Sequence, residues 1–496
     1  MNGSPQPASD DALLDAYEEV AYVGHPNRKS HPDRMATIAT LLGMNPAPPA
    51  SCRVLELACG DGANLIPVAA SLPGSRFVGI DFAPSGIARA QRMTTGLGLT
   101  NIEFLTLDLR AFPEDFGAFD YIIAHGLYSW VPATVRAGLL PLVARHLAPN
   151  GVAFVSYNTF PGCHIRRALW DILKYHTRDV TDHRAKLVAA RSLISLLSDP
   201  ASTHMEIDAS LRQELQSMST LTDSALAHDD LSEPNDPVYF HEFAAELERN
   251  DLTFLAEADL HAMVGLGITP RVRLALGNMD RLTREQYLDF VHFRRYRQSL
   301  VCHAGVLSRF VVDPARARPM HASASTALLR LGMEGNIGVP GEDADARALK
   351  ELLAIRWPQS IPVAELATWH ASRARKSAEG ATPRAAIETP VVQTYGAGLL
   401  ELGLQPPTVV ATAGQHPTAF APARWQARDA DVVTNVYHEV VSMNDSLQRQ
   451  LLLLLDGTRT RGQLVAEAGA SLGAADRAGL LQKALDQLAR FALLVA

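Results

Sequence analysis

Short apolar runs alternate with amphipathic stretches between Arg53 and Tyr157, and this alternation limits the possible folds more than any other feature. The apolar runs are Val54–Leu57, Phe77–Ile80, Ile102–Leu107, Tyr121–Ala124 and Val152–Ser156. The stretches with apolar residues at helical spacing are Asn64–Leu72, Pro84–Leu97 and Ala133–Leu147. Strands that alternate with helices in this way form parallel sheets joined by crossover helices. We therefore predict a doubly wound α/β sheet.

The pattern changes after the fifth predicted strand. Three consecutive helices are expected over His164–Thr177, Asp182–Leu197 and Ile207–His228, as a helical insertion. The sheet is then completed by a helix at Tyr239–Asn250, a strand at Leu252–Glu257, a helix at Arg284–Phe293 and a strand at Tyr296–His303. The expected fold is a Rossmann-like seven-stranded sheet interrupted by this insertion.

Beyond about residue 310, polar, Gly-rich and Pro-rich segments separate two similar helical blocks. The blocks are Ala348–Leu366 with Val391–Leu404, and Leu447–Val465 with Arg477–Val495. Each predicts a helix, a polar turn, a second helix and a longer apolar helix. This order indicates two winged-helix-like units, with generic helical packing as the alternative. The helix at Arg477–Arg490 has few basic residues, so a protein contact is expected there rather than DNA reading.

Charge and composition exclude several classes of protein. The net charge of −8 argues against nucleic acid as the main partner. The longest apolar stretches, Leu451–Leu455 and Ala492–Ala496, are far shorter than the roughly 18 to 20 residues that cross a bilayer, and the first residues do not resemble a signal peptide. The four cysteines lack a C-x-x-C spacing, which argues against a disulfide framework or a structural zinc site. We expect a soluble protein of the reducing cytoplasm.

A glycine turn follows the first predicted strand. Gly60 and Gly62 allow a tight turn and close approach of the backbone to a ligand. A dinucleotide-binding fingerprint requires a third glycine where Leu65 stands. Glu56 lies four residues before Gly60 instead, an arrangement that resembles motif I of class I S-adenosylmethionine-dependent methyltransferases. In that motif the loop faces the methionine part of the cofactor.

Two further acids are expected at strand ends. Asp81, 21 residues after Gly60, ends the second predicted strand and can accept hydrogen bonds from both ribose hydroxyls. Asp108 ends the third predicted strand, where it can accept a hydrogen bond from the adenine amino group, with the Leu109 amide beside a ring nitrogen. The three signals together predict S-adenosylmethionine binding. The alternatives are a nucleotide site or an empty Rossmann domain.

The segments Phe119–Pro132 and Ser156–Gly162 resemble bacterial methyltransferases that carry a methyltransferase regulatory domain. These include protein-lysine methyltransferases of outer-membrane proteins. The similarity also covers Tyr22, Ser30–Pro32, Val238–Phe243, Glu285–Tyr287, Arg297–Leu300 and Leu454–Thr458. The resemblance implies a catalytic domain coupled to a middle helical region and a C-terminal winged-helix domain.

On this basis we expect five parts in the 496 residues. They are an N-terminal helical segment covering the cofactor site (1–45), a Rossmann-like cofactor-binding core (46–163), the helical insertion (164–235), a regulatory-type segment that completes the sheet (236–310) and a C-terminal winged-helix-like domain (311–496). The residues expected around the cofactor are Tyr22, His31, Glu56, Ala58, Cys59, Gly60, Gly62, Asn64, Asp81, Phe82, Ser85, Asp108, Leu109 and His125.

The acceptor side is less sharply defined. The segment His125–Tyr128 stands where amide- and adenine-methylating enzymes carry an Asp/Asn-Pro-Pro-Tyr tetrad. An amine acceptor must lose a proton before it attacks a methyl group, and His125 is a candidate either for accepting that proton or for lining the pocket. Tyr128, Trp130 and Tyr157 are candidates for an aromatic wall that holds a cationic substituent, with core packing as the alternative for Trp130.

A metal site is not predicted. His228, Asp229, His241 and Glu242 can be combined on paper, but His241-Glu242 lacks a second histidine four residues on. We interpret these four residues as helix caps or surface contacts.

The sequence therefore predicts methyl transfer from S-adenosylmethionine to a nitrogen, with a protein lysine side chain as the expected acceptor. A small-molecule methyltransferase with a deep, enclosed pocket and a non-catalytic cofactor-binding adaptor are the alternatives. The long C-terminal region is expected to dock a protein substrate. The oligomeric state stays open, with a homodimer as one alternative.

Overall fold

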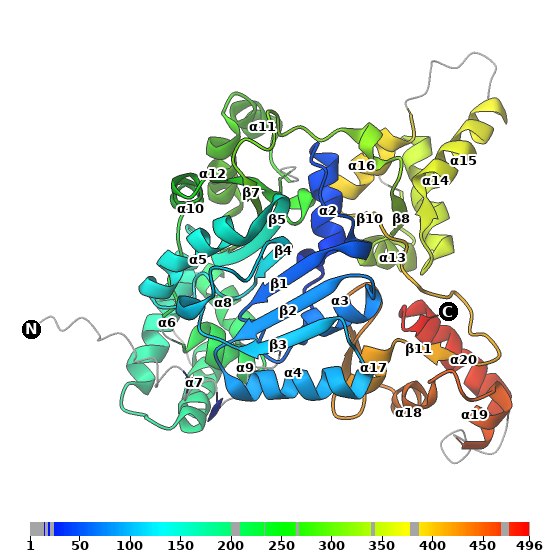
Figure 1. Cartoon of the computed structure of the whole chain (residues 1–496), viewed down its shortest axis with the longest axis horizontal. Helices are drawn as coiled ribbons and strands as arrows, with labels where there is room; N and C mark the ends of the chain where they lie inside the picture. Colours follow the sequence, from blue (N-terminus) through cyan, green and yellow to red (C-terminus); the bar gives the residue numbers. More distant parts are fainter. Residues whose placement is uncertain are drawn as a thin grey trace, which may run out of the picture.

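The computed structural model describes residue 14, residues 18–19, and residues 24–199, 209–232, 234–263, 267–338, 343–376, 386–467 and 476–495. A seven-stranded sheet lies at its centre, in the order β3-β2-β1-β4-β5-β7-β6 (Figure 1). Its strands are β1 (Arg53–Leu57), β2 (Arg76–Asp81), β3 (Ile102–Thr106), β4 (Phe119–Ala124), β5 (Leu147–Asn158), β6 (Leu252–Glu257) and β7 (Tyr296–His303). The first five strands pair in parallel, and β7 lies antiparallel between β5 and β6. The predicted α/β sheet is confirmed.

Helices cover both faces of this sheet because successive strand residues point to opposite sides. On one face α2 (Pro32–Leu41), α3 (Leu65–Ser71) and α4 (Pro84–Leu97) pack against residues such as Val54 and Ile123. On the other face α5 (Ala133–His146) and α10 (Phe240–Arg249) pack against residues such as Leu55 and Ile122. The helices leave open the end of the sheet at which the parallel strands have their carboxyl termini. Doubly wound sheets bind ligands at this end.

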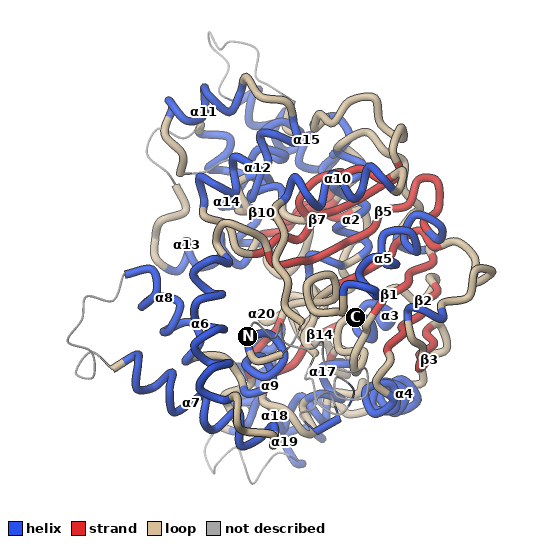
Figure 2. Tube along the Cα trace, turned by 90° about the vertical axis from the view of Figure 1, so that its left-hand side faces the viewer, coloured by secondary structure: helices blue, strands red, loops and turns tan. Residues whose placement is uncertain are grey.

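The insertion after β5 is helical, as predicted. Its main helices are α6 (Cys163–Thr177), α7 (His183–Ser198) and α8 (Ala209–Ser219), which Figure 2 shows grouped apart from the strands. The prediction of one helix over Ile207–His228 is wrong, and Ile207 itself lies outside the described residues. The chain breaks after Ser219, and the Thr222 side chain accepts a hydrogen bond from Ala225 N to begin α9 (Asp223–Ala225). A π-helical turn, Leu226–Asp230, follows directly.

The regulatory-type segment adds α11 (Pro270–Gly277) and α12 (Arg281–His292) before β7. The predicted helix starts at Arg281 rather than Arg284, because the Asp280 carboxylate caps the first turn by accepting two backbone N–H groups. A buried ion cluster then joins α12 to β6 and β7. In that cluster Arg297, with no exposed surface, contacts the carboxylates of Glu257, Glu285 and Asp289.

The C-terminal region forms two successive units of helices and short strands. The first contains β8 (His321–Ala324), α13 (Thr326–Met333), α14 (Ala344–Arg356), β9 (Ile361–Pro362), α15 (Val363–Lys376), α16 (Glu388–Gly396) and β10 (Leu400–Gly403). The second contains β11 (Thr418–Ala419), α17 (Ala421–Gln426), β12 (Val432–Thr434), β13 (Val440–Ser442), α18 (Ser446–Leu454), α19 (Arg461–Glu467), α20 (Arg477–Arg490) and β14 (Leu494–Val495). The first unit shares the core of the sheet, whereas the second has a core of its own and contacts α3 and α4 through α17.

Two observations concern the cysteines and the membrane. Cys52, Cys59, Cys163 and Cys302 are all buried, and none forms a disulfide. Within the described ranges, no helix combines the length and the apolar character that spanning a bilayer requires.

Candidate active site

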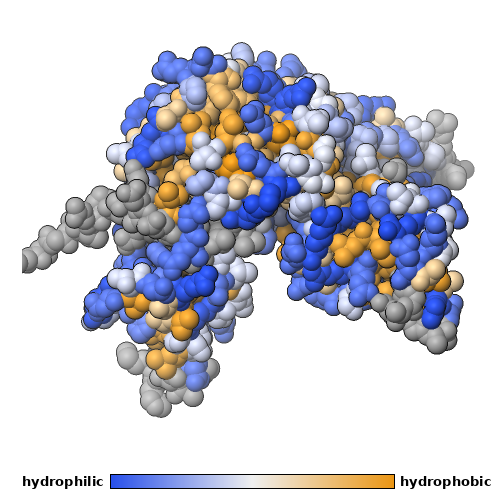
Figure 3. Space-filling view, turned by 60° about the horizontal axis from the view of Figure 1, so that its bottom comes forward, coloured by the Kyte–Doolittle hydropathy of each residue, from blue (hydrophilic) through white to orange (hydrophobic). Residues whose placement is uncertain are grey.

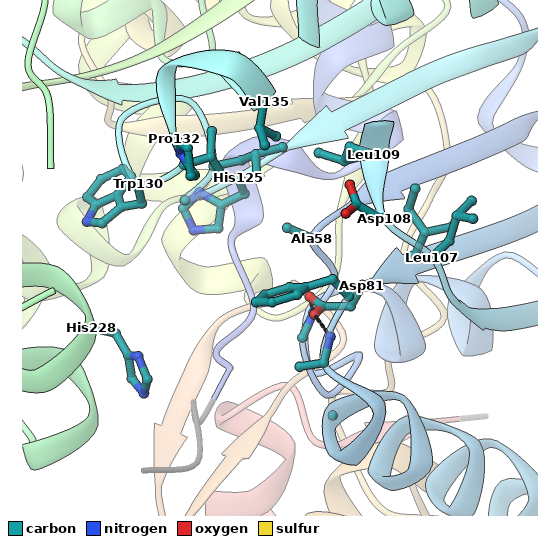
Figure 4. Close-up of a pocket in the computed structure, with 18 of the residues that line it drawn as sticks. Ala58, Asp81, Leu107, Asp108, Leu109, His125, Trp130, Pro132, Val135 and His228 are labelled. Carbon is teal, nitrogen blue, oxygen red and sulfur yellow. Dashed lines mark hydrogen bonds between the residues drawn. The ribbon is translucent and has the colours of Figure 1, made fainter. Parts of the chain in front are cut away.

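The glycine turn after β1 borders a pocket at the carboxyl edge of the sheet (Figure 4). Ala58, Gly60 and Gly62 have φ angles of 57°, 55° and 75°, so the chain reverses directly from β1 toward α3. A side chain at position 62 would collide with the Phe104 ring, and glycine is therefore required there. Ala58 and Gly60 line the pocket with little or no side chain, which leaves the backbone of the turn open to a ligand.

Asp81 connects this turn to the end of β2. Its Oδ2 accepts a hydrogen bond from Gly60 N at 2.8 Å, and its Oδ1 accepts one from Ala83 N at 2.9 Å. Burial raises the pKa of Asp81, while these backbone donors act against the shift. Each carboxylate oxygen keeps a further lone pair for a ligand hydroxyl.

Asp108 also lines the pocket, at its far end, but β3 ends two residues earlier at Thr106. The side chain caps a short 3₁₀ turn and accepts hydrogen bonds from Arg110, including one from Nη2 at 2.5 Å. The Arg110 guanidinium therefore holds the pKa of Asp108 below its usual range. Unlike Asp81, this carboxylate is partly exposed, so it lies at the rim of the pocket.

Most of the predicted cofactor residues share this one pocket. The pocket is lined by Ala58, Gly60, Asp81, Phe82, Ser85, Asp108, Leu109, His125 and Trp130 among the predicted residues. The N-terminal segment reaches the same place, because Ser85 N donates a hydrogen bond to Glu18 Oε1 at 3.2 Å. Tyr22 lies outside the described residues.

His125, immediately after β4, stands at the middle of the pocket. Its Nδ1 lies 3.0 Å from Ser156 Oγ and 3.4 Å from the Tyr296 hydroxyl, and the Asn27 amide lies 3.3 Å from its Nε2. Burial lowers the pKa of His125 to about 4. The imidazole is therefore uncharged at neutral pH and is a weak proton acceptor for an amine.

The other end of the pocket is aromatic and apolar, with one carboxylate. Trp130, Val131 and Pro132 line it from the β4 side, and His228 and Asp229 line it from the π-helical turn. The prediction that His228 and Asp229 are only helix caps or surface contacts is therefore wrong, and sequence reasoning missed them as pocket residues. Their adjacent acidic and imidazole side chains were a signal, but nothing in the local pattern places them opposite β4.

A second group of predicted residues lies behind the turn, outside the pocket. Glu56 Oε1 accepts a hydrogen bond from Asn64 Nδ2 at 2.7 Å, and Asn64 Oδ1 accepts one from Asn27 N at 2.8 Å. His438, from the loop between β12 and β13, lies with its Nε2 2.9 Å from the same Asn64 oxygen. Burial raises the pKa of Glu56 to about 8. The second C-terminal unit thus completes the packing of the motif.

The remaining predicted positions divide between this rear cluster and the core. His31 caps α2, accepting a hydrogen bond from Asp33 N at 3.1 Å, and its ring lies edge-on to His438. Cys59 and Gly62 pack behind the turn and do not line the pocket.

The prediction that Tyr128 and Tyr157 form an acceptor wall is wrong. Both are buried in the core on the α10 side of the sheet, where the Tyr157 ring lies 4.3 Å from that of Phe243. The Tyr128 hydroxyl donates to Glu246 on α10. Tyr157 lies in the core rather than at the pocket because side chains alternate along a strand. Tyr157 therefore points to the same face of the sheet as Val155, two residues earlier on β5.

Comparison with known families decides what this fold is. A methyltransferase domain model matches residues 54–151. A model described as a predicted methyltransferase regulatory domain matches residues 222–303, and the C-terminal winged helix domain of PKMT matches residues 415–474. The chain is a class I methyltransferase with a regulatory domain. The predicted resemblance is confirmed.

Relatives of this methyltransferase cover different parts of it. It is 37% identical over 292 residues to uncharacterised protein RP789 of Rickettsia prowazekii, spanning 58% of this chain and about half, 52%, of that protein. It is 31% identical to uncharacterised protein RP028 of the same species over 48% of this chain and 96% of that protein. The structure of PKMT2 from Rickettsia typhi in complex with AdoHcy superposes with a TM-score of 0.80 at 23% identity, over 96% of this chain and all of that chain, 100%. That likeness extends the fold to nearly the full length.

The methyltransferase domain takes S-adenosylmethionine as its cofactor, and the pocket fits that group. The turn at Ala58 and Gly60 leaves backbone accessible, and Asp81 offers acceptors for hydroxyls. Ile80, Leu107 and Leu109 supply apolar surface next to Asp108, as a purine ring requires. Glu56 Oε2, buried behind the turn and outside the pocket, has no hydrogen-bond partner within the described ranges.

Low pH is expected to weaken the contact between the second C-terminal unit, which carries His438, and Asn64 behind the glycine turn. Burial lowers the pKa of His31 to about 4 and that of His438 well below its usual value. In the unfolded chain both histidines have a pKa of about 6.5, which is above their values in the folded protein. Between these values the unfolded chain binds more protons than the folded protein does. The free energy of unfolding therefore falls as the pH drops below about 6.5. Urea unfolding at pH 7.5 and 5.0 measures this loss.

The matched variant is His438→Gln, which keeps a donor toward Asn64 but cannot titrate. Its loss of stability between pH 7.5 and 5.0 should be smaller than that of the wild type. Glu56 titrates in the opposite sense, since its raised pKa stabilises the fold as pH falls, but it is present in both proteins. Equal losses in both would contradict the prediction.

Proposed function

We propose that this protein transfers the methyl group of S-adenosylmethionine to the side-chain nitrogen of a protein lysine. The observation that carries the proposal is the aromatic and apolar end of the pocket, formed by Trp130, Val131 and Pro132, in a pocket that the acidic residue Asp229 also lines. An alkyl chain that ends in an ammonium group matches such a surface, since the methylene groups contact the apolar wall and the charge meets the aromatic ring and the carboxylate.

The two ends of the pocket have distinct chemistry. Figure 4 shows Asp108 and Leu109 at one end and Trp130 with His228 at the other, with His125 between them. When bound, S-adenosylmethionine supplies a methyl group on a sulfonium sulfur, which an aligned lone pair can attack. The chain's own residues hold the two reactants in one enclosure, and positioning of this kind supplies much of the rate acceleration.

The architecture supports a macromolecular acceptor. The fold matches PKMT2 of Rickettsia typhi over nearly all of both chains, and residues 415–474 match the PKMT winged helix domain. Figure 3 shows the helical insertion and the second C-terminal unit as separate lobes on either side of a hollow. A protein substrate that rests between such lobes can extend one side chain toward the pocket.

The decisive experiment incubates the protein with radiolabelled S-adenosylmethionine and the protein extract of its host. The extract is then hydrolysed and analysed for methylated amino acids. Label in methyl-lysine supports the proposal. Label in small molecules, in other amino acids or in none of the fractions overturns it, and label in small molecules favours the alternative of a small-molecule methyltransferase.

A further inference from the structure

We infer that Asp229, on the π-helical turn Leu226–Asp230, binds the acceptor amine and takes its proton before methyl transfer. This inference rests on the proposed function, because it requires a nitrogen acceptor. It assigns proton transfer to the helical insertion rather than to the strand ends that hold the cofactor.

The turn itself directs adjacent residues to different partners. His228 and Asp229 line the pocket, whereas Asp230 points into the insertion, where its two oxygens each lie 2.7 Å from the Arg166 guanidinium. Trp170 Nε1 donates to the same carboxylate at 2.7 Å. π-Helical turns are rare in proteins as a whole, but those that occur are often at functional sites. Such a turn changes the directions in which consecutive side chains point. The Asp230 contacts therefore fix Asp229 at the wall of the pocket.

Asp229 lines the same pocket as the aromatic surface where an alkylammonium group is expected, and its charge acts on Tyr296, whose ring contacts Trp130. Figure 4 shows His228 on the same side as Trp130, away from Asp108. The Trp130 and Tyr296 ring centroids lie 6.4 Å apart, and the Tyr296 hydroxyl lies 3.4 Å from His125 Nδ1. Asp229 is the carboxylate at this end of the pocket, and it is half-buried, so a proton that it accepts can pass to solvent.

Its electrostatic surroundings suit a base that works near neutral pH. Burial and the neighbouring Asp230 charge raise the pKa of Asp229 to about 7, and Arg166 acts against the shift. The other titratable groups that face it are His228 on the same turn and Tyr296 on β7. A carboxylate with this pKa is about a thousandfold stronger base than His125, whose pKa is about 4.

The step balances without a further reactant. The ammonium of the acceptor gives one proton to the Asp229 carboxylate and becomes a neutral amine. The nitrogen lone pair forms the bond to the methyl carbon while the carbon–sulfur bond breaks, and that electron pair remains on sulfur. The product is a methylated ammonium, and Asp229 returns its proton to solvent.

The test compares the wild type with Asp229→Asn and Asp229→Glu, using Asp171→Asn on the exposed surface of α6 as the matched control. Single-turnover formation of methyl-lysine in the host extract is followed from pH 6 to 10, and adenosylhomocysteine affinity is measured by calorimetry. We expect Asp229→Asn to lower the rate at pH 7 at least about a hundredfold with the ligand affinity retained. Asp229→Glu should recover part of the rate.

The pH profiles separate proton transfer from a structural role. The wild-type rate should level off above about pH 7, whereas the Asp229→Asn rate should keep rising toward the amine pKa of about 10.4, so that the deficit shrinks with pH. A wild-type rate that rises without a plateau overturns the inference, even if the variants fail to fold. So does an Asp229→Asn variant whose acceptor KM rises while its pH profile matches the wild type.

Failure of the proposed function gives a different result. If the wild type forms no methyl-lysine, both proposals are overturned. If it forms methyl-lysine and Asp229→Asn does so at the same rate with the same profile, only the role of Asp229 is overturned.

Discussion

Replacing Arg297 with methionine should lower the free energy of unfolding by about 3 to 5 kcal/mol. Its guanidinium is completely buried and contacts Glu257 Oε1 at 2.6 Å, Asp289 Oδ2 at 2.9 Å and Glu285 Oε2 at 3.3 Å. Arg297 is the main counter-charge for these carboxylates, which remain buried after the substitution. The cost is that of burying negative charge without a partner.

Urea unfolding followed by tryptophan fluorescence measures this effect, with Arg295→Met as the matched control. Arg295 lies next to β7, but its ion pair with Glu214 is half-exposed and should contribute less than about 1 kcal/mol. Adding Glu257→Gln to Arg297→Met should recover part of the loss, since one unpaired charge is removed. A double variant that is less stable by the sum of both changes would show that packing, rather than charge, causes the loss.

Replacing Asp81 with alanine should weaken adenosylhomocysteine binding by about tenfold to more than a hundredfold. Loss of a hydrogen bond to a charged acceptor costs roughly 1.5 to 3 kcal/mol. The substitution also frees the Gly60 and Ala83 amides, which fix the shape of the turn. Asp81→Asn, which retains one oxygen acceptor, should lie between the wild type and Asp81→Ala.

Calorimetric titration measures these affinities, with Asp115→Ala in an exposed loop as the control. NAD should bind to none of the proteins, because Leu65 is buried where a dinucleotide site needs glycine. Unchanged affinity in folded Asp81→Ala would remove Asp81 from the cofactor site.

Elements with strong local signals were predictable from the sequence. α4 begins and ends at the predicted residues, because Pro84 suits the first turn and Gly98 ends the helix with a φ of 66°. The strands β6 and β7 also have the predicted bounds. The helix expected over Ile207–His228 failed because the chain breaks after Ser219 and a new helix begins at the Thr222 cap. The π-helical turn that follows is held by a tertiary contact of Asp230 with Arg166, which helical periodicity does not reveal.

The cofactor end of the site was predictable from local sequence signals, whereas the acceptor end was not. The signals at the ends of β1 and β2 are local, and the chain order alone brings Gly60 and Asp81 together. The acceptor end depends on where the insertion folds back, so Asp229 could not be placed, and Tyr128 and Tyr157 were assigned to the wrong face. Nothing near Asn64 in the sequence indicates that His438 contacts it, because 374 positions separate the two residues.

That separation also orders events during synthesis. A ribosome that adds about 5 to 20 residues per second needs roughly 20 to 75 s to travel the 374 residues from Asn64 to His438. The last sheet strand, β7, ends at His303, 135 positions before His438, so for roughly the final 7 to 27 s of that interval all seven strands exist while the back of the glycine turn still lacks its last partner. The nascent enzyme therefore acquires its finished cofactor loop only when the final winged-helix unit emerges, so a chain interrupted before that point keeps the motif without its support.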